Sequence, residues 1–445
     1  MSLLSRLGGE QIDSDSKKVN TSIPVPMSKN SPELEVLLHS YLVDELKKPV
    51  NQNQEIEPLI ENLMNDFLIK EGTHLTFEEK KQLKHDISHE ITGYGPITPL
   101  LENPAVTEIM VNGPDAIYIE MNGRIEKTSI HFRDNLHVLR VIEKIVAPLG
   151  RRIDESVPLV DARLPDGSRV NAIIPPLALN GPTMTIRKFS EVPFTINDLL
   201  RMGSLSENMA LFLKAAVESK LNIFISGGTG SGKTSTLNVI SSFIPNDERI
   251  LTIEDSAELR LAQEHVVALE SRSQNIEGQG EITIRDLVRN ALRMRPDRII
   301  IGEVRGGETL DMLQAMNTGH DGSLGTGHAN SPRDLLARLE TMVLMAGFEL
   351  PVRAIRQQIS AALDLIVQQA RMKDGSRKVT RITEVLGLEG DTIVLQDIFV
   401  YNERKNPTSG RREFQFTTSG IRPNCIEKFS RAGYNINAMF KDEWV

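Results

Sequence analysis

The sequence predicts an α/β protein whose largest domain contains a parallel β-sheet covered by helices. From about Glu207 onward, short apolar runs alternate with helical patterns, and successive strands joined by helices pair in parallel. A glycine-rich turn joins the first of these runs to a helix. Turn signals such as Asn112-Gly113 mark a smaller α/β segment upstream, and a helical segment precedes it.

Helical and strand patterns divide the chain into five parts. The first part is polar and is expected to be a disordered tail. The parts that follow are a helical bundle, a smaller α/β domain, a hinge linker and the large domain. The expected boundaries are 1–33, 34–92, 93–188, 189–206 and 207–445.

Periodicity identifies the expected elements in each part. Strands are predicted in the smaller α/β domain at 106–113, 116–132 and 169–177, with an amphipathic helix at 135–150. The large domain is predicted to alternate strands with helices. Its strands are expected at 221–226, 249–255, 297–304 and 323–328. The basic stretch at 371–381 predicts a hairpin-like turn with solvated charges.

Composition limits the function classes. The 445 residues carry a net charge of -9 and only 4% aromatic residues, which disfavours a nucleic-acid partner. A single cysteine, Cys425, excludes an intrachain disulfide and a four-cysteine zinc site. We find neither a signal-peptide core nor an apolar run of about 18 residues. A cytoplasmic protein is expected, with membrane association only through partners.

The glycine-rich turn matches the phosphate-loop pattern G-x-x-x-x-G-K-[ST] without a mismatch, between a strand and a helix. Glycines let backbone N–H groups surround phosphate oxygens, and the helix presents its positive end to the same anion. Lys233 is expected to reach the β- and γ-phosphates, and Thr234 to bind Mg²⁺. We therefore predict ATP and Mg²⁺ as ligands. The expected binding residues are Gly227, Gly228, Thr229, Gly230, Ser231, Gly232, Lys233, Thr234 and Ser235.

Carboxylates at the ends of two predicted strands are candidates for catalysis of ATP hydrolysis. Glu254 and Asp255 end one predicted strand, and Glu303 ends the next. Carboxylates beside a triphosphate suit metal positioning or water activation, so Thr234, Glu254 and Glu303 are the expected metal ligands. An acidic helix start is the alternative for Glu254. Gly302 stands where many phosphate-loop ATPases have an aspartate.

A second glycine-rich loop carries His320 and His328, which are candidates to sense the γ-phosphate. A structural hydrogen-bonding role is the alternative. Three arginines of the smaller domain, Arg163, Arg169 and Arg187, are candidates to stabilise transition-state charge. Their alternative role is as solvated surface charges.

Four motifs follow one another along the chain: GGTGSGKT, TIEDSAELRL, RPDRIIIGEVRGGE and GHDGSLGTGHANSP. In this order they resemble the motifs of the secretion-superfamily ATPases. Members of that superfamily are the hexameric motors of type II and type IV secretion and of type IV pili. Upstream, the segments GYGPITPLLENPAVTEIMVNGPDAIYIEMNGRI and VDARLPDGSRVNAIIPPLALNGPTMTIRKFS are similar to the CpaF/TadA branch, the motor of tight-adherence pili. The resemblance covers roughly residues 90–400.

The resemblance implies a homo-hexamer whose RecA-like phosphate-loop NTPase domain follows an N-terminal domain. ATP would bind between the two domains, and hydrolysis would move them and so drive pilus assembly through inner-membrane platform proteins. The chain would then be cytoplasmic and peripheral to the inner membrane. The implied catalytic residues are Glu303, Glu254, His328, Arg163, Arg169 and Arg187.

Three alternatives share parts of this pattern. A type IV secretion ATPase that drives substrate export has the same core motifs, and only the upstream segments argue against it. A nucleic-acid translocase requires a basic, aromatic-lined channel, which the composition does not favour. An ATP-binding scaffold with negligible turnover would leave Glu254 and Glu303 without a role.

Overall fold

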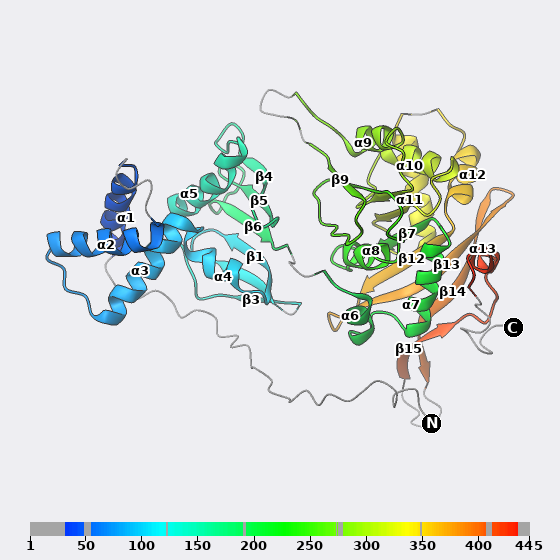
Figure 1. Ribbon diagram of the computed structural model, residues 1–445, viewed down its shortest axis with the longest axis horizontal. Coiled ribbons are helices and arrows are strands. Elements are labelled where there is room, and N and C mark those ends of the chain that lie inside the picture. Colours follow the sequence, from blue (N-terminus) through cyan, green and yellow to red (C-terminus); the bar gives the residue numbers. More distant parts are fainter. Residues whose placement is uncertain are drawn as a thin grey trace. The chain divides into compact units, whose positions relative to one another are not determined.

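The computed structural model describes residues 32–48, 55–121, 123–189, 193–272, 274, 279–347, 349–405 and 412–434. The chain divides into two compact units, Met1–Phe189 and Ser190–Val445 (Figure 1). The tail expected at 1–33 lies outside the described residues, except for its last two positions.

The first unit begins with three helices that share a core: α1 (Pro32–Leu46), α2 (Ile56–Lys70) and α3 (Phe77–Thr92). Thr76 and Glu79 form a capping box, which satisfies backbone N–H groups at the start of α3. The buried apolar side chains of the three helices form one cluster: Leu38, Leu42, Leu59, Ile60, Leu63, Met64, Phe67, Leu68, Leu83 and Ile87.

A six-stranded sheet forms most of the remainder of the first unit. Its order is β3-β2-β1-β6-β5-β4, and every neighbouring pair is antiparallel. The apolar side of α5 packs on the buried face of this sheet. The elements are η3 (Gly95–Ile97), α4 (Thr98–Glu102), β1 (Val106–Asn112), β2 (Ile117–Met121), β3 (Arg124–Lys127), α5 (Asn135–Val146), η4 (Ala147–Leu149), β4 (Leu159–Arg163), β5 (Arg169–Ile173) and β6 (Thr183–Arg187).

Two side chains of α5 hold the C-terminal end of α3. The Lys144 ammonium donates hydrogen bonds to the carbonyl oxygens of Glu90, Ile91 and Gly93, at 2.9, 2.8 and 2.6 Å. His137 Nε2 lies 2.8 Å from Glu90 Oε1. A cation at the C-terminus of a helix interacts favourably with the helix dipole. The helical bundle is therefore attached to α5 by exposed hydrogen bonds of Lys144 and by the buried contact of His137 with Glu90.

A nine-stranded mixed sheet forms the frame of the second unit, in the order β15-β14-β13-β12-β7-β11-β10-β8-β9. The strands from β12 to β9 pair in parallel, which confirms the expected α/β fold with a parallel sheet. Strand β9, beside β8, and the antiparallel extension β13–β15 were not anticipated. The strands are β7 (Ile223–Gly227), β8 (Ile250–Glu254), β9 (Val266–Glu270), β10 (Arg298–Ile301), β11 (Leu324–Gly327), β12 (Leu365–Arg371), β13 (Arg377–Glu389), β14 (Thr392–Lys405) and β15 (Arg412–Thr418).

Helices cover both faces of the large sheet (Figure 1). Ile223 and Ile225 of β7 join a core with α6, α7, α8 and α13, whereas Phe224 faces a second core with α9 to α12. This alternation explains why β7 is an unbroken apolar run, because both of its faces are buried. The helices are α6 (Ile196–Arg201), α7 (Glu207–Glu218), α8 (Lys233–Ser241), α9 (Ile284–Ala291), α10 (Glu308–Asn317), α11 (Pro332–Met345), α12 (Val352–Ala362) and α13 (Ile426–Arg431).

The segment expected to be a hinge, 189–206, contains helix α6 and a few buried side chains of the second unit, and the hinge itself stays a prediction. Residues 190–192 lie outside the described residues. Helix α6 begins after Thr195, and the side chains of Leu199 and Leu205 are buried in the core. In the described part of the chain, no helix combines the length and the apolar character that a membrane span needs.

Polar side chains tie together the amino-terminal edge of the parallel sheet. Arg298 is fully buried and donates hydrogen bonds to the Glu248 carboxylate (2.5 and 3.1 Å) and to the carbonyl oxygens of Gly322 (3.1 Å) and Val217 (2.9 Å). The Asn222 side chain accepts from the N–H groups of Gly322 and Ser323 and donates to the carbonyl of Ala362. These bonds join the segments that precede β7, β8, β10, β11 and β12.

Candidate active site

The phosphate loop lies where the chain leaves β7 and enters α8. Gly230 and Gly232 have φ values of 70° and 94°, in the left-handed region that favours glycine. At Gly227, an added Cβ would lie 2.4 Å from the carbonyl oxygen of Gln369 on β12. Thr234 and Ser235 are the second and third residues of α8. Conformation and close backbone contact therefore explain three of the loop glycines.

Lys233 is folded back over this loop. Its ammonium donates a hydrogen bond to the carbonyl oxygen of Gly228 at 3.1 Å, and it lies 3.4 Å from His328 Nδ1. Burial lowers the pKa of Lys233, an effect that the nearby carboxylate of Glu303 partly offsets. The loop therefore holds a buried cation that an anionic ligand would stabilise.

Glu303 occupies the centre of a polar chain at the carboxyl edge of the sheet. Its Oε1 lies 2.8 Å from His328 Nε2, and its Oε2 accepts a hydrogen bond from Arg305 at 2.7 Å. Arg305 also lies 3.6 Å from Asp255. Burial alone would raise the pKa of Glu303. The hydrogen bond and charge of Arg305, aided by His328 and Lys233, outweigh burial and hold that pKa below its ordinary value.

The contacts of His328 indicate which ring nitrogen carries the proton. Because the Lys233 ammonium can only donate, His328 Nδ1 is the acceptor of that contact. Nε2, which then carries the ring proton, lies 2.8 Å from Glu303 Oε1, a contact that does not have hydrogen-bond geometry. Burial, with the charge of Lys233, lowers the pKa of His328. The His328 ring therefore lies between the lysine and the carboxylate. His320 lies at the opposite end of β11, where its Nδ1 is 3.3 Å from the carbonyl oxygen of Ala315.

Glu254 is almost fully buried, and its carboxylate faces its own chain. It accepts hydrogen bonds from the N–H groups of Glu258 (3.0 Å) and Leu259 (3.2 and 3.3 Å). The residues after Asp255 form an irregular segment, so the acidic-helix-start alternative is wrong. A Cβ added to Gly302 would lie 2.8 Å from Glu254 Cγ. Glu254 thus fills the space that a side chain before Glu303 would need.

The three candidate arginines belong to the first unit, on neighbouring strands. Arg163 on β4 pairs in register with Arg169 on β5, which pairs with Arg187 on β6. The residues next to them, such as Val170 and Ile186, are buried, so the arginines lie on the sheet face opposite α5. The antiparallel register therefore gathers guanidinium groups from three separate sequence positions.

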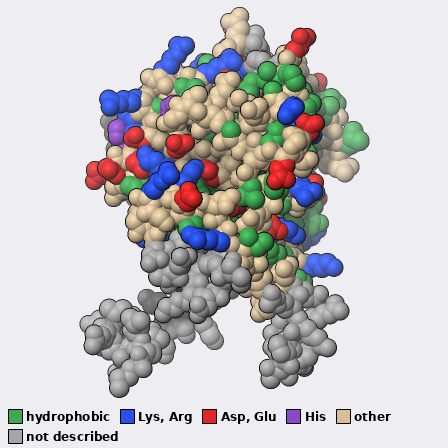
Figure 2. All heavy atoms as spheres, turned by 90° about the vertical axis from the view of Figure 1, so that its right-hand side faces the viewer, with side chains coloured by type: hydrophobic (Ala, Val, Ile, Leu, Met, Phe, Trp, Pro, Cys, Tyr) green, Lys and Arg blue, Asp and Glu red, His purple; other side chains and the backbone are tan. Residues whose placement is uncertain are grey.

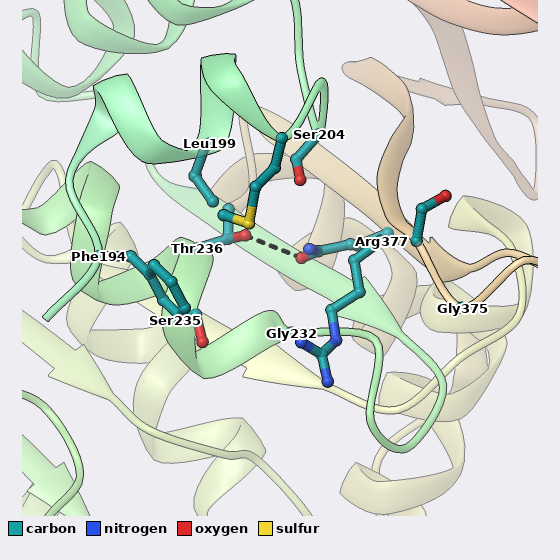
Figure 3. Close-up of a pocket in the computed structure, with 11 residues that line it drawn as sticks. Phe194, Leu199, Ser204, Gly232, Ser235, Thr236, Gly375 and Arg377 are labelled. Atoms are coloured by element: carbon teal, nitrogen blue, oxygen red, sulfur yellow. Dashed lines mark hydrogen bonds between the residues drawn. The ribbon is translucent and has the colours of Figure 1, made fainter. Parts of the chain in front are cut away.

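Sequence reasoning missed a contribution from the basic hairpin between β12 and β13. Arg377 Nε donates a hydrogen bond to the carbonyl oxygen of Gly230 in the phosphate loop, at 3.0 Å. Gln369 Oε1 accepts a hydrogen bond from Thr236 Oγ1 at 2.9 Å, drawn as a dashed line in Figure 3. The parallel pairing of β12 with β7 brings the hairpin to the loop, and no local pattern predicts that pairing.

A pocket of about 280 Å³ lies beside the start of α8, close to the lower end of the usual range for ligand pockets (Figure 3). One wall is apolar and comes from α6 and the residues that flank it. The other walls come from α8 and the basic hairpin. The lining residues are Phe194, Leu199, Met202, Ser204, Gly232, Ser235, Thr236, Gln369, Gly375, Ser376 and Arg377.

On the face that Figure 2 shows, acidic and basic side chains are interspersed among the described residues.

Comparisons with known proteins give relatives across this part of the chain. The model of the family "Type II/IV secretion system protein" matches residues 90–403. A putative conjugal transfer protein of Mycobacterium tuberculosis is 36% identical over 307 residues, which are 68% of this chain and 87% of that protein. The type IV secretion system protein VirB11 of Bartonella henselae is 32% identical over 346 residues, covering 67% of this chain and 95% of that protein.

Solved structures give similar neighbours. The VirB11 ATPase of the Brucella suis type IV secretion system, in complex with sulphate, is 31% identical with a TM-score of 0.36, over 64% of this chain and 91% of that chain. The pilus retraction motor PilT with bound ADP is 21% identical with a TM-score of 0.46, over 68% of this chain and 80% of that chain.

The family match includes the phosphate loop, Glu254, Glu303 and His328. It confirms the secretion-superfamily resemblance, whereas the tight-adherence branch stays a prediction. With its phosphate loop and adjacent carboxylates, the chain is an ATP hydrolase, and it belongs to the type II/IV secretion system protein family.

Proposed function

We propose that this protein is the ATP-driven motor of a type IV secretion machine and couples ATP hydrolysis to export of a macromolecular substrate. The observation that carries the ATPase part is the continuous contact path from Lys233 through His328 to Glu303 beside the phosphate loop. The names of the relatives, a conjugal transfer protein and VirB11, support the secretion part.

In this proposal, Lys233 and the loop N–H groups bind the phosphates. Thr234 and Glu303 fit Mg²⁺, which commonly takes one or two protein oxygens together with phosphate oxygens and water. Bound Mg²⁺ would neutralise charge on the β- and γ-phosphates. Glu303, held ionised by its neighbours, orients and polarises the attacking water. Glu254 fits a direct metal contact less well, because backbone N–H groups occupy its carboxylate.

The pocket beside α8 is proposed to receive the nucleoside of ATP. It opens next to Ser235, immediately after the phosphate loop, so a triphosphate in the loop would direct its ribose and base there. Phe194, Leu199 and Met202 offer an apolar wall to a flat base. Arg377 and Ser376 supply polar groups on the opposite side.

Arg163, Arg169 and Arg187 are proposed to contact the phosphates when the first unit of the same or a neighbouring subunit closes on the site. Their register across three strands supports this role, because it places three guanidinium groups in one row across the sheet, where Glu108 of β1 follows Arg187. A homo-hexamer that docks on inner-membrane platform proteins, from the cytoplasmic side, completes the proposal. Nucleic acid is not an expected direct partner, given the net charge of -9.

Pilus assembly is the second candidate function. The segments at 93–125 and 160–190 resemble the motors of tight-adherence pili, and both lie within the family match at 90–403. The same hydrolysis chemistry would then move a platform that inserts or removes pilin subunits. Deleting the gene distinguishes the two candidate functions. A secretion motor predicts loss of substrate transfer with pili intact, whereas a pilus motor predicts cells without pili.

The ATPase part is tested with the purified full chain and Glu303→Gln, which keeps the shape of the side chain. We expect wild type to hydrolyse ATP and the variant to lose at least about 100-fold in kcat, while still binding a fluorescent ATP analogue. Native mass spectrometry on both samples reports the ring. Equal turnover by the two proteins would refute the role of Glu303.

A further inference from the structure

The hairpin between β12 and β13 reaches the phosphate loop through one side chain. The Arg377 guanidinium donates to the carbonyl oxygen of Gly230 at 3.0 Å. A Cβ added to Gly232 would meet Arg377 Cδ and Gln369 Nε2, each at 3.1 Å, so the hairpin lies directly against the loop. A change in the loop backbone must therefore move Arg377 or break its hydrogen bond.

The next residue of the same strand reaches a different element. Lys378 Nζ donates to the carbonyl oxygens of Met202 and Gly203, at 3.2 and 2.6 Å. The N–H of Val379 donates to the carbonyl oxygen of Ser204 at 2.8 Å. These carbonyl groups belong to the residues that directly follow α6, and α6 is the first helix of the second unit.

Neighbouring residues on a strand point to opposite sides of the sheet. Arg377 can therefore contact the phosphate loop while Lys378, the next residue, contacts the end of α6. The turn between them and β12 is fixed locally, because Asp374 accepts hydrogen bonds from the N–H and hydroxyl of Ser376. The pocket in Figure 3 is walled by these same elements, with Leu199 from α6, Met202 directly after it and Gly375 from the hairpin.

We propose that Arg377 and Lys378 form a coupling pair, which transmits the state of the phosphate loop to helix α6. Arg377 is a positioning residue that holds the loop through Gly230, and Lys378 holds the end of α6. This inference rests on the proposed ATPase function and adds the route by which nucleotide binding reaches the chain connection between the two units. A hairpin with a purely structural role would support the sheet without responding to nucleotide.

Hydrogen exchange on the full chain, with and without a slowly hydrolysed ATP analogue, tests the coupling. In wild type, the analogue is expected to slow exchange at the loop (227–234) and, by about threefold or more, at α6 and the two residues that follow it (196–203). In Arg377→Gln and in Lys378→Gln, the loop still responds while the change at 196–203 falls to less than about half of the wild-type change. Direct contact of the nucleoside with Leu199 and Met202 accounts for the part that remains. For Arg377→Gln we also expect KM for ATP to rise by about three- to tenfold.

Arg381→Gln is the matched control, since Arg381 lies on the same strand and pairs with Asp397 on β14. It should behave like wild type in exchange and in kinetics. An α6 response of wild-type size in both Arg377→Gln and Lys378→Gln would overturn the coupling, as would its loss in the control. If the wild-type loop shows no protection, the proposed nucleotide site fails, and the coupling fails with it.

Discussion

Replacing Gly302 with alanine tests why this chain has glycine before Glu303. The added Cβ would lie 2.8 Å from Glu254 Cγ, 3.1 Å from its Oε1 and 3.4 Å from its Cβ. Glu254 is only 3% exposed, so it has little free space into which to move. Part of the clash involves Cγ rather than the flexible end of the side chain, and relief requires a shift of the buried carboxylate.

Such a shift weakens the hydrogen bonds that Glu254 accepts from the N–H groups of Glu258 and Leu259. Overpacking of a buried site costs about 1–3 kcal/mol, and we expect Gly302→Ala to lower the free energy of unfolding by that amount. Displacement of the adjacent Glu303 by as little as about 1 Å could lower kcat by up to about 100-fold. Urea unfolding and steady-state ATP hydrolysis measure the two effects.

Two further variants decide whether the clash is the cause. Gly306→Ala is the control, because its Cβ would meet only the end of the Glu308 side chain, at 3.3 Å. In Gly302→Ala combined with Glu254→Ala the clash is gone, so the two losses of stability should not add. Strict additivity, or a Gly302→Ala protein with wild-type stability and turnover, would refute the reasoning.

Three more predictions follow from buried or paired groups. Arg305→Gln removes the hydrogen bond and charge that lower the pKa of Glu303, so the acid limb of the kcat/KM profile should move to higher pH; an unmoved limb contradicts this. Arg298→Met leaves Glu248 without its buried partner and should cost about 3–5 kcal/mol in urea unfolding, whereas a loss below 1 kcal/mol would argue against a role in stability. Burial raises the pKa of the Cys425 thiol, so a thiol reagent at pH 8 should label the protein only in denaturant.

The sequence was a good guide where function and fold share a local pattern. Gly227–Thr234 predicted the strand, turn and helix of the phosphate loop, since glycines and a preceding apolar run are local signals. The buried strands that end near Glu254 and Glu303 were also predicted from their apolar character. Parallel pairing then followed from the alternation of strands with helices.

Contacts between distant segments could not be predicted in this way. The stretch at 371–381 forms the predicted hairpin-like turn, and its charged residues Arg371, Lys373, Arg377 and Arg381 are exposed, as expected. The local pattern does not show that one of these exposed charges contacts the phosphate loop. Only the pairing of β12 with β7 places Arg377 on the phosphate loop. The orientation of Glu254 could not be predicted either, because its position at the end of a strand does not reveal that nearby N–H groups donate to its carboxylate.

The polar bonds at the amino-terminal edge of the large sheet limit where this unit can deform. Arg298 and Asn222 join the chain segments at the starts of five strands there, and each of these hydrogen bonds is buried. Buried bonds of this kind resist stretching more than solvated loops do. Any conformational change that ATP drives would then be confined to the opposite edge of the sheet, while the edge at Arg298 keeps its structure.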